Sequence, residues 1–180
     1  MQKVLIQFDG SNFYNKVKKI DPQIHLTNFD YSGFCNMLAK SAKFKPVYYV
    51  GEIKKFDNDK KSKILYSGQQ SLFLNPRAQN IDIKLGYILF SDTKYHEKGV
   101  DVQIAVDIVM GAIKNEYDVC YLISSDTDLL PAIKDATAEG KKVVYVAFDK
   151  YVSRALLKNC SSTIIIKKSD IQRFRKVSQK

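Results

Sequence analysis

Cysteine and histidine are scarce in this chain. Its three cysteines, Cys35, Cys120 and Cys160, lie far apart, and none belongs to a C-x-x-C pair. An odd and sparse count argues against a disulfide framework and is typical of a reducing compartment. With only two histidines, His25 and His96, a zinc site built from cysteine and histidine is not expected.

Long apolar runs are missing as well. No stretch reaches the roughly 18–20 apolar residues of a membrane span. The start of the sequence leads from Met1-Gln2-Lys3 directly into Val4-Leu5-Ile6, without the three regions of a secretory leader. We therefore expect a cytoplasmic protein with no membrane partner.

Internal repeats and low-complexity linkers are also absent. A chain of 180 residues lies in the range of roughly 100–200 residues that is typical of one domain. We predict a single domain over residues 1–180, with a basic C-terminal tail at about 167–180. No phosphate-binding G-x-x-x-x-G-K-[ST] or G-x-G-x-x-G follows a predicted strand, so we set a nucleotide-binding protein aside.

Positive charge, by contrast, is in excess. The formal net charge is +10 and the pI is about 9.4. Such a balance favours a polyanionic partner, chiefly nucleic acid. The alternative is a lysine-rich surface that only interacts with water.

Apolar runs alternate with helical patterns along the chain. Strands are predicted at residues 3–8, 46–51, 81–90, 118–124, 143–148 and 163–166. Helices are predicted at 11–20, 29–42, 101–114, from near Asp128 to Gly140 and at 151–158, and another one follows a polar loop at 54–63 and stops before Pro76. Because several strands are apolar throughout, we predict a Rossmann-like three-layer α/β/α sandwich with a mostly parallel central sheet.

Aspartates follow two of the predicted strands. Asp9 ends the first strand, and Asp126 and Asp128 follow the strand at 118–124. Ligands of open α/β sheets bind at the carboxyl ends of the strands. Asp101 begins a predicted helix and should face the same edge, so we expect these four carboxylates to converge.

Carboxylates that share one cleft repel one another unless a cation neutralises them. A hard divalent ion, Mg²⁺ or Mn²⁺, prefers such oxygen ligands. In a nuclease it can generate hydroxide, orient the scissile phosphate and stabilise the leaving oxygen. The alternative is that these aspartates only cap the helices that follow them.

Polar neighbours of these aspartates are candidate supporting residues. Asn12 could bond a carboxylate or a phosphate oxygen, and Ser124 and Ser125 could offer hydroxyls to Asp9 or to a metal-bound water. The alternative for all three is that they stabilise turns.

Two further residues lie near Asp101 in the sequence. Asp107 is six residues away and turned from it on a regular helix, yet it could still face the sheet as a supporting residue. Lys98 could contact the scissile phosphate or simply lie on the surface.

A nucleic acid would be held by phosphate contacts and by base stacking. The basic candidates are Lys54, Lys55, Lys60, Lys61, Lys63, Lys141, Lys142, Lys167, Lys168, Arg173, Arg175 and Lys176. The stacking candidates are Tyr48, Tyr49, Tyr66, Tyr95 and Tyr151, with packing in the core or at its rim as the alternative.

The chain resembles the NYN domain, in the LabA-like branch of the PIN-like nuclease superfamily. The resemblance spans residues 3–148, and it rests on Phe8-Asp9-Gly10-Ser11-Asn12, on Lys98-Gly99-Val100-Asp101-Val102 through Asp107, on Ser124-Ser125-Asp126-Thr127-Asp128-Leu129 with Pro131, and on Gly140-Lys141-Lys142-Val143. It implies an acidic metal site formed by Asp9, Asp101, Asp126 and Asp128, with Asn12 beside it. It also implies a ribonuclease that acts on single-stranded or structured RNA.

One position departs from the pattern of the family. Where many relatives have glycine between the serine and the first aspartate, this chain has Ser125. Serine is expected to fit unless the turn requires a positive φ angle.

We therefore interpret the chain as a Mg²⁺- or Mn²⁺-dependent ribonuclease that hydrolyses phosphodiester bonds. The main alternative is a non-catalytic RNA-binding module on the same fold. A haloacid dehalogenase-type phosphatase needs D-x-D after the first strand, and here Asp9-Gly10-Ser11 lacks the second aspartate. The sequence is compatible with a homodimer as well as with a monomer.

Overall fold

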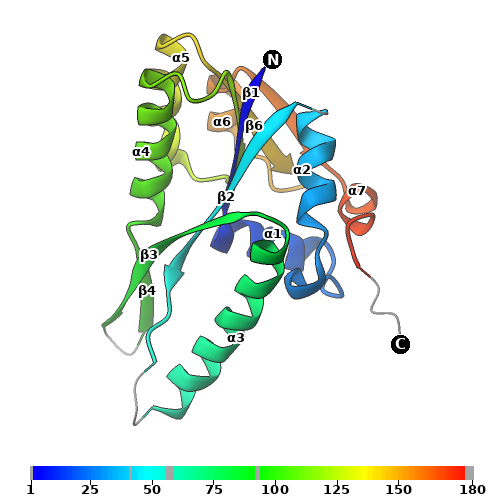
Figure 1. Ribbon diagram of the computed structural model, residues 1–180, viewed down its shortest axis with the longest axis vertical. Helices are drawn as coiled ribbons and strands as arrows, with labels where there is room; N and C mark the ends of the chain where they lie inside the picture. Colours follow the sequence, from blue (N-terminus) through cyan, green and yellow to red (C-terminus); the bar gives the residue numbers. More distant parts are fainter. Residues whose placement is uncertain (1, 41, 56–58, 92–93, 177–180) are drawn as a thin grey trace.

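The computed structural model describes residues 2–40, 42–55, 59–91 and 94–176. Within these residues the strands form one sheet of order β4-β3-β2-β1-β5-β6-β7 (Figure 1). The strands are β1 (Lys3–Asp9), β2 (Lys43–Glu52), β3 (Asp82–Ser91), β4 (Lys94–Lys98), β5 (Val119–Ile123), β6 (Lys142–Phe148) and β7 (Ser162–Ile166). Neighbouring strands are parallel except β3 and β4, which are antiparallel.

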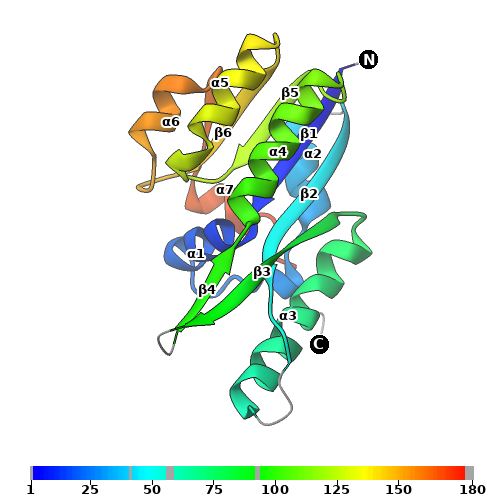
Figure 2. The same ribbon diagram turned by 90° about the vertical axis from the view of Figure 1, so that its left-hand side faces the viewer.

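Helices cover both faces of the sheet. They are α1 (Gly10–Ile20), α2 (Tyr31–Ala39), α3 (Lys60–Ala78), α4 (Val100–Ile113), α5 (Leu130–Ala138), α6 (Arg154–Asn159) and α7 (Lys168–Gln172), with short 3-10 helices η1 (Leu26–Asn28) and η2 (Thr127–Leu129). Figures 1 and 2 show α4 and α5 on one side of the sheet and α2 and α7 on the other. None of the described helices is both long and apolar enough to cross a membrane.

Alternation along β1 explains the two layers. Phe8 is buried in the same apolar cluster as Phe13 of α1 and Phe34 of α2, and the Phe8 and Phe13 rings meet edge to face at 5.3 Å. Leu5 points to the opposite face and shares a second cluster with Ile104 of α4. Because successive side chains of a strand point to opposite faces, one apolar strand supports both layers. The predicted α/β/α sandwich with a mostly parallel sheet is confirmed.

The order of the strands reverses between β1 and β5. The chain proceeds outward from β1 to β2 and β3 on one side, and from β5 to β6 and β7 on the other. At such a reversal the loops after the two central strands diverge and leave a crevice at their carboxyl ends. In Figures 1 and 2, α3 and the β3–β4 pair extend past this end of the sheet.

The prediction for the third long helix was wrong at both ends. It begins at Lys60, inside the predicted loop at 54–63, of which residues 56–58 lie outside the described part of the chain. It also continues past Pro76 to Ala78. Proline removes one helical hydrogen bond, but Pro76 is buried and the side chain of Asn75 donates to the carbonyl oxygens of Leu26 and Phe29 at 2.9 and 2.8 Å. These tertiary contacts outweigh the local preference.

The strand β4 and the helix α7 were not predicted. The sequence of β4 (Lys-Tyr-His-Glu-Lys) has no apolar alternation, and the strand exists because β3 pairs with it. Polar and charged residues are common on such edge strands. The helix α7 lies within the predicted basic tail, and Phe174 after it is buried in the core; residues 177–180 of that tail lie outside the described part.

Candidate acidic active site

Asp9 is the most buried carboxylate at the crevice. It is the last residue of β1 and the N-cap of α1, and only 5% of its surface is exposed. Its Oδ1 accepts a hydrogen bond from the backbone N–H of Asn12 at 3.0 Å, and its Oδ2 accepts one from the Ser124 hydroxyl at 2.7 Å. Two bonds from two different segments therefore fix the orientation of this carboxylate.

The segment after β5 brings two more aspartates to the same edge. Ser124 directly follows β5 and is buried. Its hydroxyl oxygen also accepts a bond from the Asp126 backbone N–H at 3.1 Å. Asp126 caps η2 by accepting from the Asp128 backbone N–H at 2.9 Å, while the Asp128 side chain is exposed. Ser124 thus links the loop that carries Asp126 and Asp128 to Asp9.

Asp101 reaches the crevice from the first turn of α4. Gly99 caps this helix with φ +79°, a left-handed conformation that glycine adopts without steric cost. The chain can therefore turn sharply from β4 into α4. The Asp101 side chain is exposed, and its charge faces those of Asp126 and Asp128.

A fifth carboxylate, Glu97, joins these four from β4. Its Oε2 accepts hydrogen bonds from the Gly51 backbone N–H at 2.7 Å and from the Ser11 hydroxyl at 3.0 Å. Sequence reasoning missed Glu97 because it did not predict β4. The only signal was its position two residues before Gly99 in the motif that contains Asp101. We call Asp9, Glu97, Asp101, Asp126 and Asp128 the acidic cluster.

The pKa values of Asp9 and Asp101 are raised, in part by the other negative charges of the acidic cluster. Burial raises the pKa of Asp9 to about 6, against the hydrogen bonds from Ser124 and Asn12, and the charges of Asp101 and Glu97 add to the rise. The pKa of Asp101 is raised first by loss of hydration and then by Asp126, Glu97 and Asp128. Negative charges from several segments therefore act on Asp9 and Asp101.

No basic side chain neutralises the acidic cluster within the described residues. The ion pairs there join Lys84 to Asp107 and Lys168 to Asp21. In the same part of the chain, no three acidic, histidine or cysteine side chains already lie at metal-binding distances. The cluster therefore brings the charges together without a closed set of ligands.

The capping alternative holds for two of the four aspartates. Asp9 caps α1 and Asp126 caps η2. Each cap uses one carboxylate oxygen, and an ionised carboxylate offers about four acceptor positions. Capping therefore leaves room for a second role at both residues.

Close packing explains the glycine after Asp9. A Cβ atom on Gly10 would lie 2.6 Å from the backbone oxygen of Tyr49 and would also overlap the Tyr48 ring. We expect Gly10→Ala to lower the free energy of unfolding by roughly 1–3 kcal/mol, as overpacking of a core does. The control is Gly68→Ala, because a Cβ there meets no atom within 4 Å and alanine favours a helix by up to about 1 kcal/mol. Urea unfolding measures both, and equal stability of the two variants would contradict this account.

Two of the predicted supporting residues, Asn12 of α1 and Ser125 after β5, lie side by side. The Asn12 amide and the Ser125 hydroxyl are hydrogen-bonded at 3.2 Å. Ser125 is not among the described residues with positive φ, so serine fits this turn without strain. These two side chains connect the loops on either side of the crevice.

Asp107 lies in a different network from the acidic cluster. Its Oδ2 accepts bonds from the Tyr49 hydroxyl at 2.7 Å and from Lys84 Nζ at 2.6 Å, and its Oδ1 accepts one from Gln103. The Tyr49 hydroxyl in turn accepts from Gln7 at 2.8 Å. The structure thus places Asp107 against the middle of the sheet and does not bring it to the four aspartates.

The predicted basic residues divide into those near the crevice and those far from it. Lys54 and Lys55 follow β2 at its carboxyl end, and Lys98 ends β4; all three are exposed. Lys141 and Lys142 lie where β6 begins, at the edge of the parallel sheet opposite to the acidic cluster.

The arginines of the tail lie beyond the far end of α1. Arg175 donates to the Gln23 side chain at 3.3 Å. Gln23 follows α1, which begins at the crevice and is 11 residues long, or ~16 Å at 1.5 Å per residue. Arg173 is the C-cap of α7, two residues before Arg175, so neither arginine lies beside the acidic cluster.

The stacking prediction fails for two tyrosines. Tyr48 and Tyr49 are 0% and 1% exposed, so no base can reach their rings. Tyr151 is partly covered by Lys16 and Lys19, whose Nζ atoms lie 4.9 and 5.6 Å from its ring centre. Tyr66 is half-buried, and the side chain of Tyr95 lies outside the described part.

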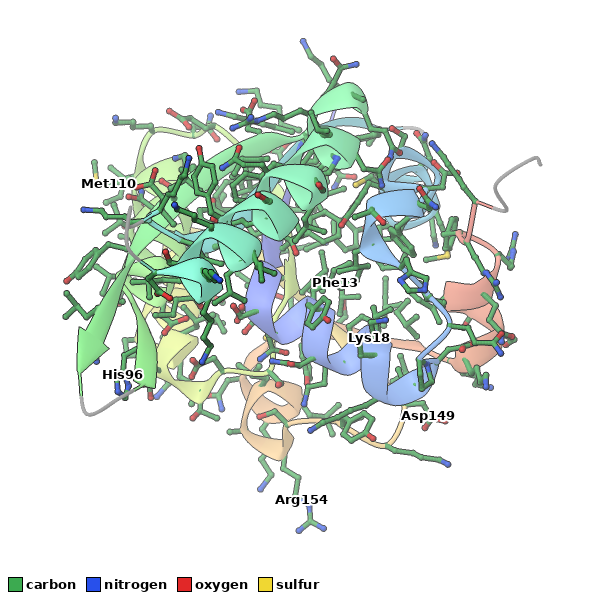
Figure 3. The ribbon with its side chains drawn as sticks, turned by 90° about the horizontal axis from the view of Figure 1, so that it is seen from below. Phe13, Lys18, His96, Met110, Asp149 and Arg154 are labelled. Carbon is green, nitrogen blue, oxygen red and sulfur yellow. The ribbon has the colours of Figure 1, made fainter. Side chains whose placement is uncertain are left out.

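Sequence reasoning also missed the lysines of α1. Lys16, Lys18 and Lys19 occupy the helix that starts directly after Asp9. Figure 3 looks onto the carboxyl ends of the strands and shows α1 between α3 and α6, with Lys18 on it. The signal was present as Asn-Lys-Val-Lys-Lys, five residues downstream of the first motif, but it was not connected with a binding surface.

Comparisons with known proteins agree with this fold. A crystal structure of a protein of unknown function from Vibrio parahaemolyticus superposes with a TM-score of 0.66 at 21% sequence identity, and it covers 92% of this chain and 93% of that one. At this identity the likeness concerns the fold alone. No curated protein matches the sequence significantly. The sequence profile of the NYN domain matches residues 3–167, nearly the whole chain, and the chain therefore belongs to the NYN domain family of the PIN-like nuclease superfamily.

Proposed function

We propose that this chain is a ribonuclease that depends on a divalent metal ion and hydrolyses phosphodiester bonds of RNA. The observation that carries the proposal is the acidic cluster. Five carboxylates from four separate segments meet at the crevice between β1 and β5, and the pKa of the buried one is raised to about 6. Membership in a nuclease superfamily supports the same reading.

The donor set fits a hard cation. Asp9, Asp101, Asp126 and Asp128 would hold Mg²⁺ or Mn²⁺, which take carboxylate and water oxygens and retain several waters. The bound ion would supply an acidified water and positive charge for the scissile phosphate and the leaving oxygen. Glu97 adds negative charge to the same edge.

The chain's own residues prepare this site in two ways. Ser124 and the Asn12 backbone N–H hold the Asp9 carboxylate in one orientation, and the Asp128 N–H does the same for Asp126. Asp101 and Asp128 are exposed and can rotate toward an ion. The proposed site thus combines two fixed carboxylates with two adjustable ones.

The net charge and the position of the lysines favour a nucleic-acid substrate. A formal charge of +10 favours a polyanion. Lys54 and Lys55 after β2 and the lysines of α1 lie on segments that adjoin the crevice. They would contact phosphates on either side of the scissile bond, with an affinity that falls as salt rises.

The second candidate is an RNA-binding module without catalysis. The observation that favours it is the absence of a ready set of three metal ligands within the described residues. It predicts salt-sensitive RNA binding that no metal ion converts into cleavage.

Metal removal tests the proposal. We expect purified protein to cut end-labelled single-stranded RNA in Mg²⁺ or Mn²⁺, to stop in EDTA, and to resume when excess metal is restored. DNA of the same sequence serves as the substrate control. Cleavage that continues in EDTA would refute the metal dependence, and tight RNA binding without cleavage in either metal would favour the non-catalytic module.

A further inference from the structure

A groove runs along the molecule between α1 and α3. It has a volume of about 620 Å³, and Val50 of β2 is among the residues that line it. Tyr14 and Lys18 line it from α1, and Leu65 lines it from α3. This volume lies within the roughly 300–1,000 Å³ of pockets that hold small organic ligands, and a nucleotide is a ligand of that size.

The groove opens at the acidic cluster. Gly10 and Ser11 line its inner end, and they directly follow Asp9. The Ser11 hydroxyl donates to Glu97 at 3.0 Å. The inner end of the groove therefore lies beside the acidic cluster.

The chemistry of the groove differs from that of the crevice. No carboxylate occurs among the described residues that line it, whereas Lys18 and His25 do. Tyr14 and Leu65 line it with 44% and 37% of their surfaces exposed. Apolar and aromatic surface next to a cation is what an unpaired nucleobase with its phosphate requires.

We propose that the α1–α3 groove holds unpaired nucleotides of the RNA strand next to the phosphate that the acidic cluster would cleave. Tyr14 stacks on a base, Leu65 covers it from α3, and Lys18 lies near the backbone phosphate. Duplex RNA cannot place a base there, because its bases are paired and stacked. The inference rests on the proposed function and adds to it the place in the fold where unpaired nucleotides are held.

Binding without turnover tests the groove separately from catalysis. Fluorescence anisotropy in EDTA would compare a short labelled single-stranded RNA with an abasic strand of the same length and charge. We expect wild-type protein to bind the strand with bases about tenfold more tightly, which lies within the range for one stacked base. Tyr14→Ala should lose that advantage while its affinity for the abasic strand stays unchanged.

Filling the groove provides a second variant that removes no contact. Gly68 lines the groove, and a Cβ there meets no atom within 4 Å. Gly68→Trp should weaken RNA binding about tenfold, and Gly68→Ala should weaken it less. Leu157→Trp is the matched control, because Leu157 is 49% exposed on α6 and does not line the groove.

The outcomes separate the two proposals. Base-dependent binding that disappears in Tyr14→Ala and Gly68→Trp supports the groove whether or not the protein cleaves RNA. Equal affinity for the strands with and without bases would overturn it, even if metal-dependent cleavage is found. If Gly68→Trp leaves RNA binding unchanged, the proposal for the groove is also overturned, and a protein partner becomes the better candidate for the groove.

Discussion

Asp9→Asn is expected to raise the free energy of unfolding by about 3 kcal/mol at pH values well above 6, measured in EDTA. The reason is the raised pKa of this buried carboxyl, which lies at about 6 instead of 3.8. A tenfold change in a proton dissociation constant corresponds to about 1.4 kcal/mol. Asparagine removes the buried charge and can still accept from the Asn12 N–H and donate to the Ser124 oxygen.

The effect has a defined dependence on pH. Between pH 3.8 and about 6 the folded wild-type protein binds more protons at Asp9 than the unfolded chain does. Its stability therefore falls as the pH rises through this window and then levels off. The difference between Asp9→Asn and wild type should be near zero below the window and full above it. Urea unfolding at a series of pH values measures this difference.

The control for this experiment is Asp135→Asn, which changes an exposed aspartate on α5. We expect it to alter stability by less than about 0.5 kcal/mol at any pH. Saturating Mg²⁺ should reduce the difference in free energy of unfolding between Asp9→Asn and wild type. The reason is that an ion that binds only the wild-type site stabilises only that protein. If the difference in free energy of unfolding between Asp9→Asn and wild type does not change with pH, the charge of Asp9 is not the cause of that difference.

The fold was predictable where local pattern and packing agree. The apolar run of β1 predicted a strand and the helical period of α4 predicted a helix, and the structure has both elements at these positions. The prediction failed at Pro76 and at β4, where contacts with other segments of the chain determine the secondary structure. Asn75 ties α3 to the segment before α2, and β3 supplies the hydrogen bonds of β4.

The candidate site was predictable to the extent that parallel strands define it. Asp9 and Asp126 follow β1 and β5, and neighbouring parallel strands end at the same edge. Glu97 was not predictable in this way, because it reaches the edge from an antiparallel strand. The same rule places Lys141 and Lys142 at the opposite edge of the sheet, because they lie where a parallel strand begins whereas Asp9 and Asp126 lie where one ends.

The same geometry connects stability with function. Asp9 lies in a place where its charge is costly, and Ser124 and Asn12 hold it there with hydrogen bonds. A protein without need of that charge would gain stability from asparagine. A buried carboxylate beside four others is the arrangement that the proposed bound cation would stabilise.

Asp126→Asn is expected to lower the rate of RNA cleavage by more than about a hundredfold. Removal of an outer partner of a metal ligand already costs about 10- to 100-fold, and a direct ligand should cost more. The fold should persist, because asparagine caps a helix as well as aspartate does and can still accept from the Asp128 N–H. Single-turnover cleavage of labelled RNA measures the loss.

Thermal unfolding with and without metal provides a readout that does not depend on activity. At a hundredfold excess over Kd, an ion that binds only the folded protein adds about 2.7 kcal/mol, or roughly 5–10 °C in Tm for a chain of this size. Asp126→Asn should reduce this rise. Asp149→Asn is the matched control, since Asp149 is an exposed aspartate that follows β6 at the same edge but is not among the charges that raise the pKa of Asp9 or Asp101. If both variants cleave RNA at the wild-type rate and retain the full rise in Tm, the ion binds elsewhere and the acidic cluster is not the active site.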